Sequence, residues 1–162
     1  MSGGRVLKLN SKAICFAAAM IILSINGVAV SVVVNEMELN PPEGGADWVE
    51  IYNPGNESVD IGGWTVTITD NSWVGKFPPV SAGTIITARG FYVFNGQSSW
   101  NHEDGGYATL YMASGEIVDK TAIRKDSLGN DFTYGRHPDG YDTNTDGDWG
   151  LGSATKGKSN VR

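Results

Sequence analysis

Cysteine is almost missing from this chain. Its 162 residues include one cysteine, Cys15, which lies inside an apolar run near the N-terminus rather than after it. Residues 31–162 therefore contain no thiol, which excludes disulfides, thiolate zinc sites and cysteine nucleophiles from that part of the chain.

Basic residues are also scarce. The chain has 12 lysines and arginines against 18 aspartates and glutamates, a formal charge of −6. Three of the 12 basic residues and none of the acidic ones lie in residues 1–30, so the rest carries nine basic residues and a charge near −9. These cations are scattered, and so acidic a chain repels a phosphate backbone. We expect no nucleic-acid partner; a cation, a basic protein or a sugar surface fits better.

No pattern typical of a catalytic centre is present either. The two histidines, His102 and His137, lie in polar, turn-like stretches and in neither a G-x-S-x-G nor an H-E-x-x-H motif. A general base needs a nucleophile and an orienting group within reach. The candidate acids for a glycosidase-like pair are Glu36, Glu38, Glu50 and Asp60. Two of them would form such a pair only if the fold brought them together across a cleft. We expect no enzymatic activity and keep a small hydrolytic or carbohydrate-active accessory protein as an alternative.

The first thirty residues differ from the rest. MSGGRVLKLNSK carries three cations and no acid, and the apolar run AICFAAAMIILSINGVAV follows it. A basic segment before an apolar one is typical of a secretory signal peptide or an uncleaved membrane anchor. The sequence thus predicts an apolar leader helix in residues 1–30 and one domain in residues 31–162. We expect a secreted or cell-surface protein that meets the membrane only through the leader.

After residue 31 the pattern is that of short β-strands. There is no sustained helical periodicity, and the 22 glycines and 6 prolines of the chain punctuate it every few residues. Seven β-branched and aromatic runs alternate with turn-rich connectors: VSVVVNEMEL, DWVEIYN, WTVTITD, TIITARGFYVFN, YATLYMA, EIVDKTAI and DFTYGR. This spacing predicts an all-β antiparallel sandwich, with ASGE at 113–116 as a hairpin turn. We expect aromatic residues to form much of its core: Trp48, Trp64, Phe77, Phe91, Tyr92, Phe94, Tyr111 and Phe132.

Several short motifs occur in a recognisable order. They are Asn35-Glu36, DWVEIYNP at 47–54, VDIGGW at 59–64, Gly115 with Val118-Asp119, Arg136 with Pro138-Asp139-Gly140, and Thr155-x-Gly157-x-x-Asn160. On these residues the chain from about Val33 to Asn160 resembles the lamin-tail domain, in the form found in many exported prokaryotic proteins. Lys156 stands where that family usually has proline.

The resemblance implies an immunoglobulin-like β-sandwich behind the leader. It also implies a non-catalytic binding or scaffolding module that acts at or outside the cell surface. The expected partner is a protein or a surface polysaccharide. A structural envelope component that associates with itself is the other alternative.

The stretch DTNTDGDWG, residues 142–150, places oxygen-bearing side chains at alternate positions: Asp142, Asn144, Asp146 and Asp148. A calcium loop of the EF-hand type begins in this way. The match then fails, because Gly150 and Ser153 occupy the last two ligand positions and no helix is indicated on either side. Two interpretations remain, a non-helical calcium loop and a solvated acidic turn.

Exposed tryptophans are the remaining candidates for binding. Trp73, Trp100 and Trp149 lie in polar stretches outside the strand pattern. At the edge of a β-sandwich, an exposed tryptophan ring can bind a sugar by stacking or anchor a protein partner. The alternative is that the ring folds back and covers the end of the core. Asn56 begins an N-x-S sequon in a turn, where a glycan could attach.

Overall fold

The computed structural model describes residues 32–161, except residues 44, 72 and 97–104. The predicted leader helix and the positions of Trp100 and His102 lie outside the described residues. Within the described part, no helix is both long and apolar enough to cross a lipid bilayer.

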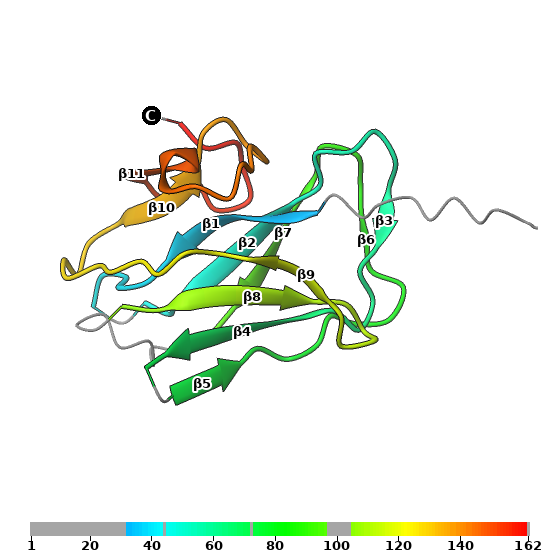
Figure 1. The fold of residues 1–162 in the computed structure, drawn as a ribbon, viewed down its shortest axis with the longest axis horizontal. Coiled ribbons are helices and arrows are strands. Elements are labelled where there is room, and N and C mark those ends of the chain that lie inside the picture. The colour runs from blue at the N-terminus through cyan, green and yellow to red at the C-terminus, as the bar shows by residue number, and fades with distance from the viewer. Residues whose placement is uncertain (1–31, 44, 72, 97–104, 162) are drawn as a thin grey trace, which may run out of the picture.

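Two antiparallel sheets face one another (Figure 1). The first has the spatial order β11 (Trp149–Ser153), β10 (Phe132–Arg136), β1 (Val33–Glu38), β2 (Trp48–Tyr52) and β7 (Phe91–Asn95). The second has the order β5 (Trp73–Lys76), β4 (Thr65–Asp70), β8 (Tyr107–Tyr111) and β9 (Ile117–Lys120). A short ladder joins β3 (Val59–Asp60) to β6 (Ile85–Ile86). The prediction of an all-β antiparallel sandwich is confirmed, and the arrangement is consistent with an immunoglobulin-like fold.

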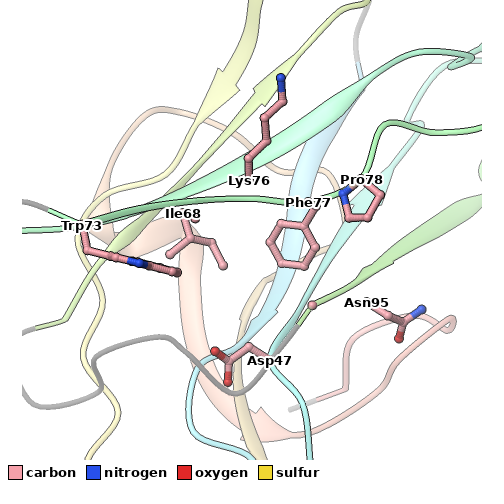
Figure 2. A pocket seen from close by; sticks show the side chains of 9 residues that line it. Asp47, Ile68, Trp73, Lys76, Phe77, Pro78 and Asn95 are labelled. Carbon is pink, nitrogen blue, oxygen red and sulfur yellow. The ribbon is translucent and has the colours of Figure 1, made fainter.

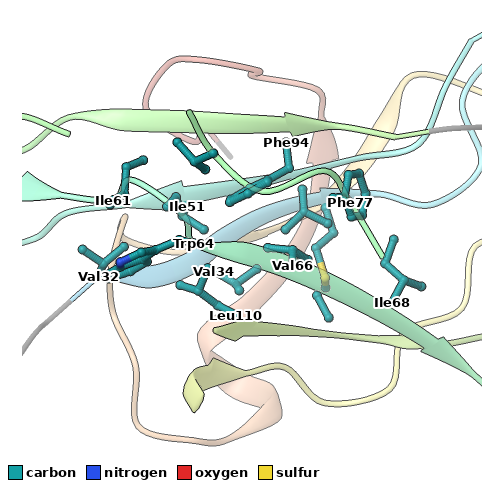
Figure 3. Close-up of a cluster of buried hydrophobic side chains, with 14 of the residues drawn as sticks. Val32, Val34, Ile51, Ile61, Trp64, Val66, Ile68, Phe77, Phe94 and Leu110 are labelled. Atoms are coloured by element: carbon teal, nitrogen blue, oxygen red, sulfur yellow. The ribbon is translucent and has the colours of Figure 1, made fainter. Parts of the chain in front are cut away.

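The core lies between the two sheets (Figure 3). Alternation along β4 turns Val66 and Ile68 inward, while Thr67 and Thr69 point to the other side. The buried side chains of both sheets meet there, among them Val34, Ile51, Phe94, Trp64 and Leu110. Burying one such side chain contributes roughly 1.5–3 kcal/mol.

The predicted hairpin at ASGE is confirmed. Tyr111 pairs with Ile117, and the Met112 N–H donates to the Glu116 carbonyl at 2.9 Å. Gly115 has a φ of 87°, a left-handed conformation that a side chain would strain.

Two strands were not predicted. WVGK forms β5 and WGLGS forms β11, although the sequence indicates connectors at both places. Both strands contain glycine, which lowers local strand propensity, and each is held by pairing with one neighbouring strand at the edge of its sheet. The run TIITARGFYVFN splits into β6 and β7 because the chain turns at Arg89, whose φ is 57°.

The predicted aromatic core is right for Trp64, Phe77 and Phe94, while Trp48 is buried and Tyr92 packs against the core cluster. The prediction is wrong for Phe91, Tyr111 and Phe132, which lie outside the cluster. Phe132 is 45% exposed on β10. Tyr111 is half-buried and lies outside the core cluster, because its neighbour Leu110 takes the inward position on β8.

Candidate functional site

The outer face of the five-stranded sheet carries a pair of buried carboxylates. Glu36 on β1 pairs directly with Glu50 on β2, and the two residues are 1% and 0% exposed. Like charges directly opposite one another destabilise a sheet unless something compensates them. The compensation comes from residues 154–161, here called the C-terminal segment, which bonds to both carboxylates.

Main-chain and hydroxyl groups of the C-terminal segment hold both side chains. The Thr155 N–H donates to Glu36 Oε1 at 2.8 Å and the Thr155 hydroxyl to Oε2 at 2.9 Å. The Gly157 N–H donates to Glu50 Oε2 at 2.6 Å. Burial raises the pKa of both glutamates, that of Glu50 to about 8, while these hydrogen bonds act in the opposite direction. Glu36 and Glu50 therefore form a buried structural pair and do not line a cleft.

The remaining motif residues at this face are also structural. Asn35 Nδ2 donates to Asp139 Oδ1 at 3.0 Å, and Asn35 Oδ1 accepts from the Gly140 N–H at 2.9 Å. Asp139 in turn accepts from the Asn160 N–H at 3.0 Å and from the Ser159 hydroxyl. The separated motifs of the sequence thus meet in one hydrogen-bond network that fixes the C-terminal segment on the sheet.

Asn53 has the turn-capping role that its position after β2 indicates. Its Nδ2 donates to the carbonyls of Glu57 at 2.7 Å and Thr87 at 3.0 Å. Its Oδ1 accepts from the Gly55 N–H at 3.0 Å. One buried amide therefore ties the turn after β2 to the turn between β6 and β7.

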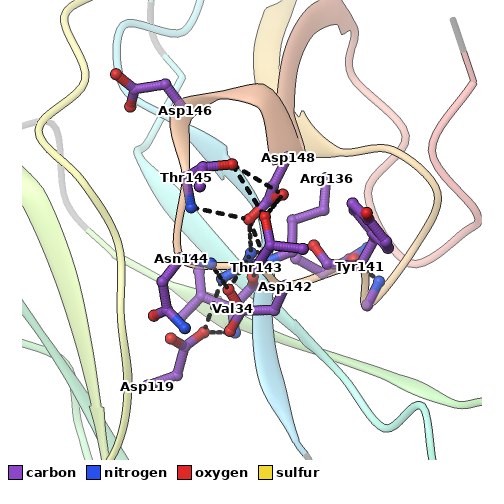
Figure 4. A network of polar contacts seen from close by, with 12 residues as sticks. Val34, Asp119, Arg136, Tyr141, Asp142, Thr143, Asn144, Thr145, Asp146 and Asp148 are labelled. Atoms are coloured by element: carbon purple, nitrogen blue, oxygen red, sulfur yellow. Dashed lines mark hydrogen bonds and ion pairs between the residues drawn. The ribbon is translucent and has the colours of Figure 1, made fainter.

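Arg136 lies at the centre of a second network (Figure 4). This 2%-exposed side chain donates from Nε to the Val34 carbonyl at 2.7 Å and from Nη1 to Asp142 Oδ1 at 2.9 Å. Its Nη2 lies 3.3 Å from Asp119 Oδ2, and its guanidinium carbon lies 4.7 Å from the centre of the Trp149 ring. Arg136 therefore joins β1, β9 and β10 to the loop at residues 142–148, here called the acidic loop.

The acidic loop folds around its own threonines. Asp148 ends the 3₁₀ helix η1 (Asp146–Asp148) and accepts from the Thr143 hydroxyl at 2.6 Å and the Thr143 N–H at 2.7 Å. These bonds lower the pKa of Asp148 to about 2. Asp146 points away from this cluster (Figure 4), and its Oδ1 lies 2.9 Å from Arg124 Nη1.

Each of the three loop aspartates thus has a cationic or hydroxyl partner within the protein. Asn144 adopts a φ of 58°, and its N–H donates to Asp142 Oδ1 at 3.0 Å. Across the described ranges, no group of three or more His, Cys, Asp or Glu side chains is arranged to hold a metal ion. Calcium binding at Asp142, Asn144, Asp146 and Asp148 stays a prediction.

The structure separates the predicted tryptophans. Trp149 is half-buried on β11 beside the guanidinium groups of Arg136 and Arg124. Trp73 is 41% exposed at the start of the edge strand β5. Its indole lies over Gly75, where an added Cβ would come within 2.2 Å of the ring. Glycine at this position is what lets the indole lie flat along the strand.

Trp73 borders a cavity of about 310 Å³ (Figure 2). Ile68 and Phe77 supply apolar walls, and Asp47 and Asn95 supply polar ones. The next residue of β5, Val74, is exposed, and among the described residues β5 pairs with β4 alone. An unpaired strand edge offers free N–H and C=O groups to a further strand. The cavity, the indole and the free edge together form the candidate binding site.

Two predicted positions lie elsewhere. Asn56 is exposed and its Oδ1 accepts from Arg89 Nη2 at 3.2 Å, so glycosylation there stays a prediction. His137 lies in the turn after β10, and its N–H donates to the Asp148 carbonyl at 2.9 Å. The roles of Asn35, Arg136 and the C-terminal segment were not predicted from the residues themselves, although the motif order marks all three.

A family model described as Lamin Tail Domain matches residues 27–125, which include β1 through β9. The match ends before β10 and the C-terminal segment. A search of curated proteins finds no match. The family match covers more than half of the sequence, and the chain belongs to the lamin-tail domain family, whose fold is immunoglobulin-like.

Proposed function

We propose that this chain is a non-catalytic binding module that holds a protein partner at or outside the cell surface. Lamin-tail domains are immunoglobulin-like, and domains of this kind in general mediate protein interactions rather than catalysis. The observation that carries the proposal is the exposure of Trp73 beside a cavity on a free strand edge. Tryptophan is enriched among the residues that dominate binding energy at protein interfaces.

The geometry favours an extended peptide segment as the bound element. Such a segment adds to a sheet as one more strand, with main-chain bonds for affinity and side-chain pockets for specificity. β5 presents the free edge, and the cavity beside Trp73 and Phe77 has room for one side chain of the partner.

Peptide selection tests the proposal. The immobilised full chain is used to select from a phage-displayed library of random decapeptides, and each enriched peptide is measured in solution. Trp73→Ala should weaken binding at least tenfold, because removing an anchoring indole costs about 2 kcal/mol or more. Tyr141→Ala removes another exposed aromatic ring and serves as the matched control. Failure to enrich any peptide, or equal affinity in the Trp73 variant, would refute the proposal.

Self-association is the second candidate, and the same free edge supports it. The edge of β5 carries exposed Trp73 and Val74, and such an edge pairs readily with a second copy. Light scattering over a hundredfold range of concentration measures this directly. A mass that doubles with concentration in the parent chain but not in Val74→Lys would favour a self-associating component over a monomeric binder.

Export through residues 1–30 is part of the proposal and rests on the sequence. The basic segment followed by an apolar run supports it. Intact-mass spectrometry of the secreted and membrane fractions tests it, since a cleaved signal peptide leaves a product that begins near residue 31. Recovery of the chain from the cytosol alone would contradict export.

A further inference from the structure

The outer face of the four-stranded sheet has a composition unlike that of the rest of the molecule. Its half-buried or exposed polar side chains, here called the hydroxyl face, are Thr67, Thr69, Lys76, Tyr107, Tyr111 and Lys120. Exposed Val74 and Ile117 lie among them, paired with Thr69 and Tyr111. Strand alternation places them there, because Val66 and Ile68 on β4 and Ala108 and Leu110 on β8 point into the core.

One row of side chains crosses all four strands of this sheet. Thr67 pairs with Lys76 on one side and with Thr109 on the other, and Thr109 pairs with Lys120. The row therefore reads lysine, threonine, threonine, lysine, with a cation at each end. A neighbouring row reads valine, threonine, tyrosine, because Thr69 pairs with Val74 on one side and with Tyr107 on the other.

The hydroxyl groups of this face are available to a ligand. In the described part of the chain, the hydroxyls of Thr67, Thr69, Tyr107 and Tyr111 make no hydrogen bond to the protein. Other threonines differ: the Thr65 hydroxyl donates to the Phe77 carbonyl at 2.8 Å. Among the described residues, the face thus holds four hydroxyl groups that have no partner in the protein.

The charge of the face is opposite to that of the chain. Both cations point outward: Lys76 extends away from the Trp73 cavity (Figure 2), and Lys120 Nζ lies 4.1 Å from the centre of the Tyr107 ring. The acids on the same strands, Asp70 and Asp119, are buried. In a chain of formal charge −6, this face is complementary to an anion.

We propose that the hydroxyl face binds an anionic polysaccharide whose sugars carry carboxylate groups. Sugar hydroxyls bond to the threonine and tyrosine hydroxyls, the sugar rings pack against the tyrosines, and carboxylates pair with Lys76 and Lys120. Adjacent strands lie about 4.8 Å apart, close to the length of one sugar unit, so successive sugars meet successive strands.

A peptide is the poorer fit for this face. Both middle strands, β4 and β8, are paired on each side, so they offer no free main-chain groups for strand addition. The inference goes beyond the proposed peptide-binding function and does not depend on Trp73, whose variant should bind the polysaccharide unchanged.

Affinity electrophoresis of the full chain in gels with and without polygalacturonate tests the proposal. The gels are repeated with dextran, a neutral glucan, and with polyglutamate, a polyanion without sugars. We expect retardation by polygalacturonate alone. Lys120→Gln and Tyr111→Phe should each weaken it about tenfold, which is the value of one charge-assisted or ligand-bonded group. Tyr111→Phe keeps the ring, so its fold is retained.

Lys158→Gln is the matched control, because it removes the same charge from an exposed position on the C-terminal segment. It should leave the retardation unchanged, as should Trp73→Ala. Retardation by polyglutamate equal to that by polygalacturonate would assign the face to acidic proteins and overturn the proposal. No retardation by polygalacturonate, or an equal loss in Lys158→Gln, would overturn it as well.

Discussion

Glu36 and Glu50 face each other across β1 and β2, sealed from solvent by the C-terminal segment. Burial raises the pKa of both carboxyls. Each carboxyl therefore keeps its proton to a higher pH than a solvent-exposed glutamate does.

Stability should therefore fall as the pH rises from 5 to about 8. A glutamate with a raised pKa in the folded state stabilises fully below its unfolded pKa, and that stabilisation is lost as the pH passes the folded value. Glu50, with a pKa of about 8, and Glu38, whose pKa burial raises to about 7, both titrate in this window. Asp148, with a pKa lowered to about 2, loses its stabilising effect only in stronger acid.

Urea unfolding at pH 5, 6, 7 and 8 measures this effect. We expect the free energy of unfolding to decrease by on the order of 1–3 kcal/mol over the range. Glu50→Gln should reduce the decrease to the part that Glu38 contributes, because the amide stays neutral, whereas the exposed control Glu57→Gln should keep all of it. Stability that rises between pH 5 and 8 would show that these carboxyls are not buried as a pair.

Arg136 should be among the residues least tolerant of substitution. Arg136→Met leaves the carboxylates of Asp119, Asp142 and Asp148 without their common cation. Removing one partner from a buried ionic network costs about 3–5 kcal/mol. Lys125→Gln removes an exposed charge and should change stability by less than about 0.5 kcal/mol. Both values come from the same urea titrations, and similar costs for the two variants would contradict the network.

Calcium binding at DTNTDGDWG remains a proposal, and thermal unfolding in EDTA and in millimolar calcium decides it. Binding at a concentration of about 100 times Kd stabilises the chain by about 2.7 kcal/mol, which raises Tm by several degrees. Asp146→Ala and Asn144→Ala should abolish the calcium-dependent part while sparing the Asp142–Arg136 contact. An equal Tm in EDTA and in calcium would reject calcium binding. The aspartates of this loop would then have only their arginine and threonine partners within the protein.

The position of the Trp73 indole depends on Gly75. Gly75→Ala places a Cβ about where the ring now lies, so the indole must move and the edge of β5 must adjust. Overpacking of this kind costs about 1–3 kcal/mol. We expect a shifted Trp73 indole N–H resonance and weaker peptide binding. Gly147→Ala, which meets only an ordinary contact, is the control; an unshifted resonance in Gly75→Ala would contradict the stacking.

The strands of the core were predictable because burial follows alternation, as Val66 and Ile68 show on β4. The edge strands β5 and β11 were not, since neighbours rather than their own residues impose their conformation. Glu36 and Glu50 look like solvated strand residues in the sequence, because what buries them lies more than a hundred positions away. Trp73 was identified as a candidate from its polar surroundings, whereas its cavity depends on the distant Asn95 and Gly96.

The bond between Thr155 and Glu36 spans 119 positions of the sequence. β1 also lies between β2 and β10, so its pairing is complete only once β10, about a hundred positions further along the chain, is in place. Such long-range pairing slows folding. Closure of the five-stranded sheet therefore depends on contacts between segments that lie far apart in the sequence.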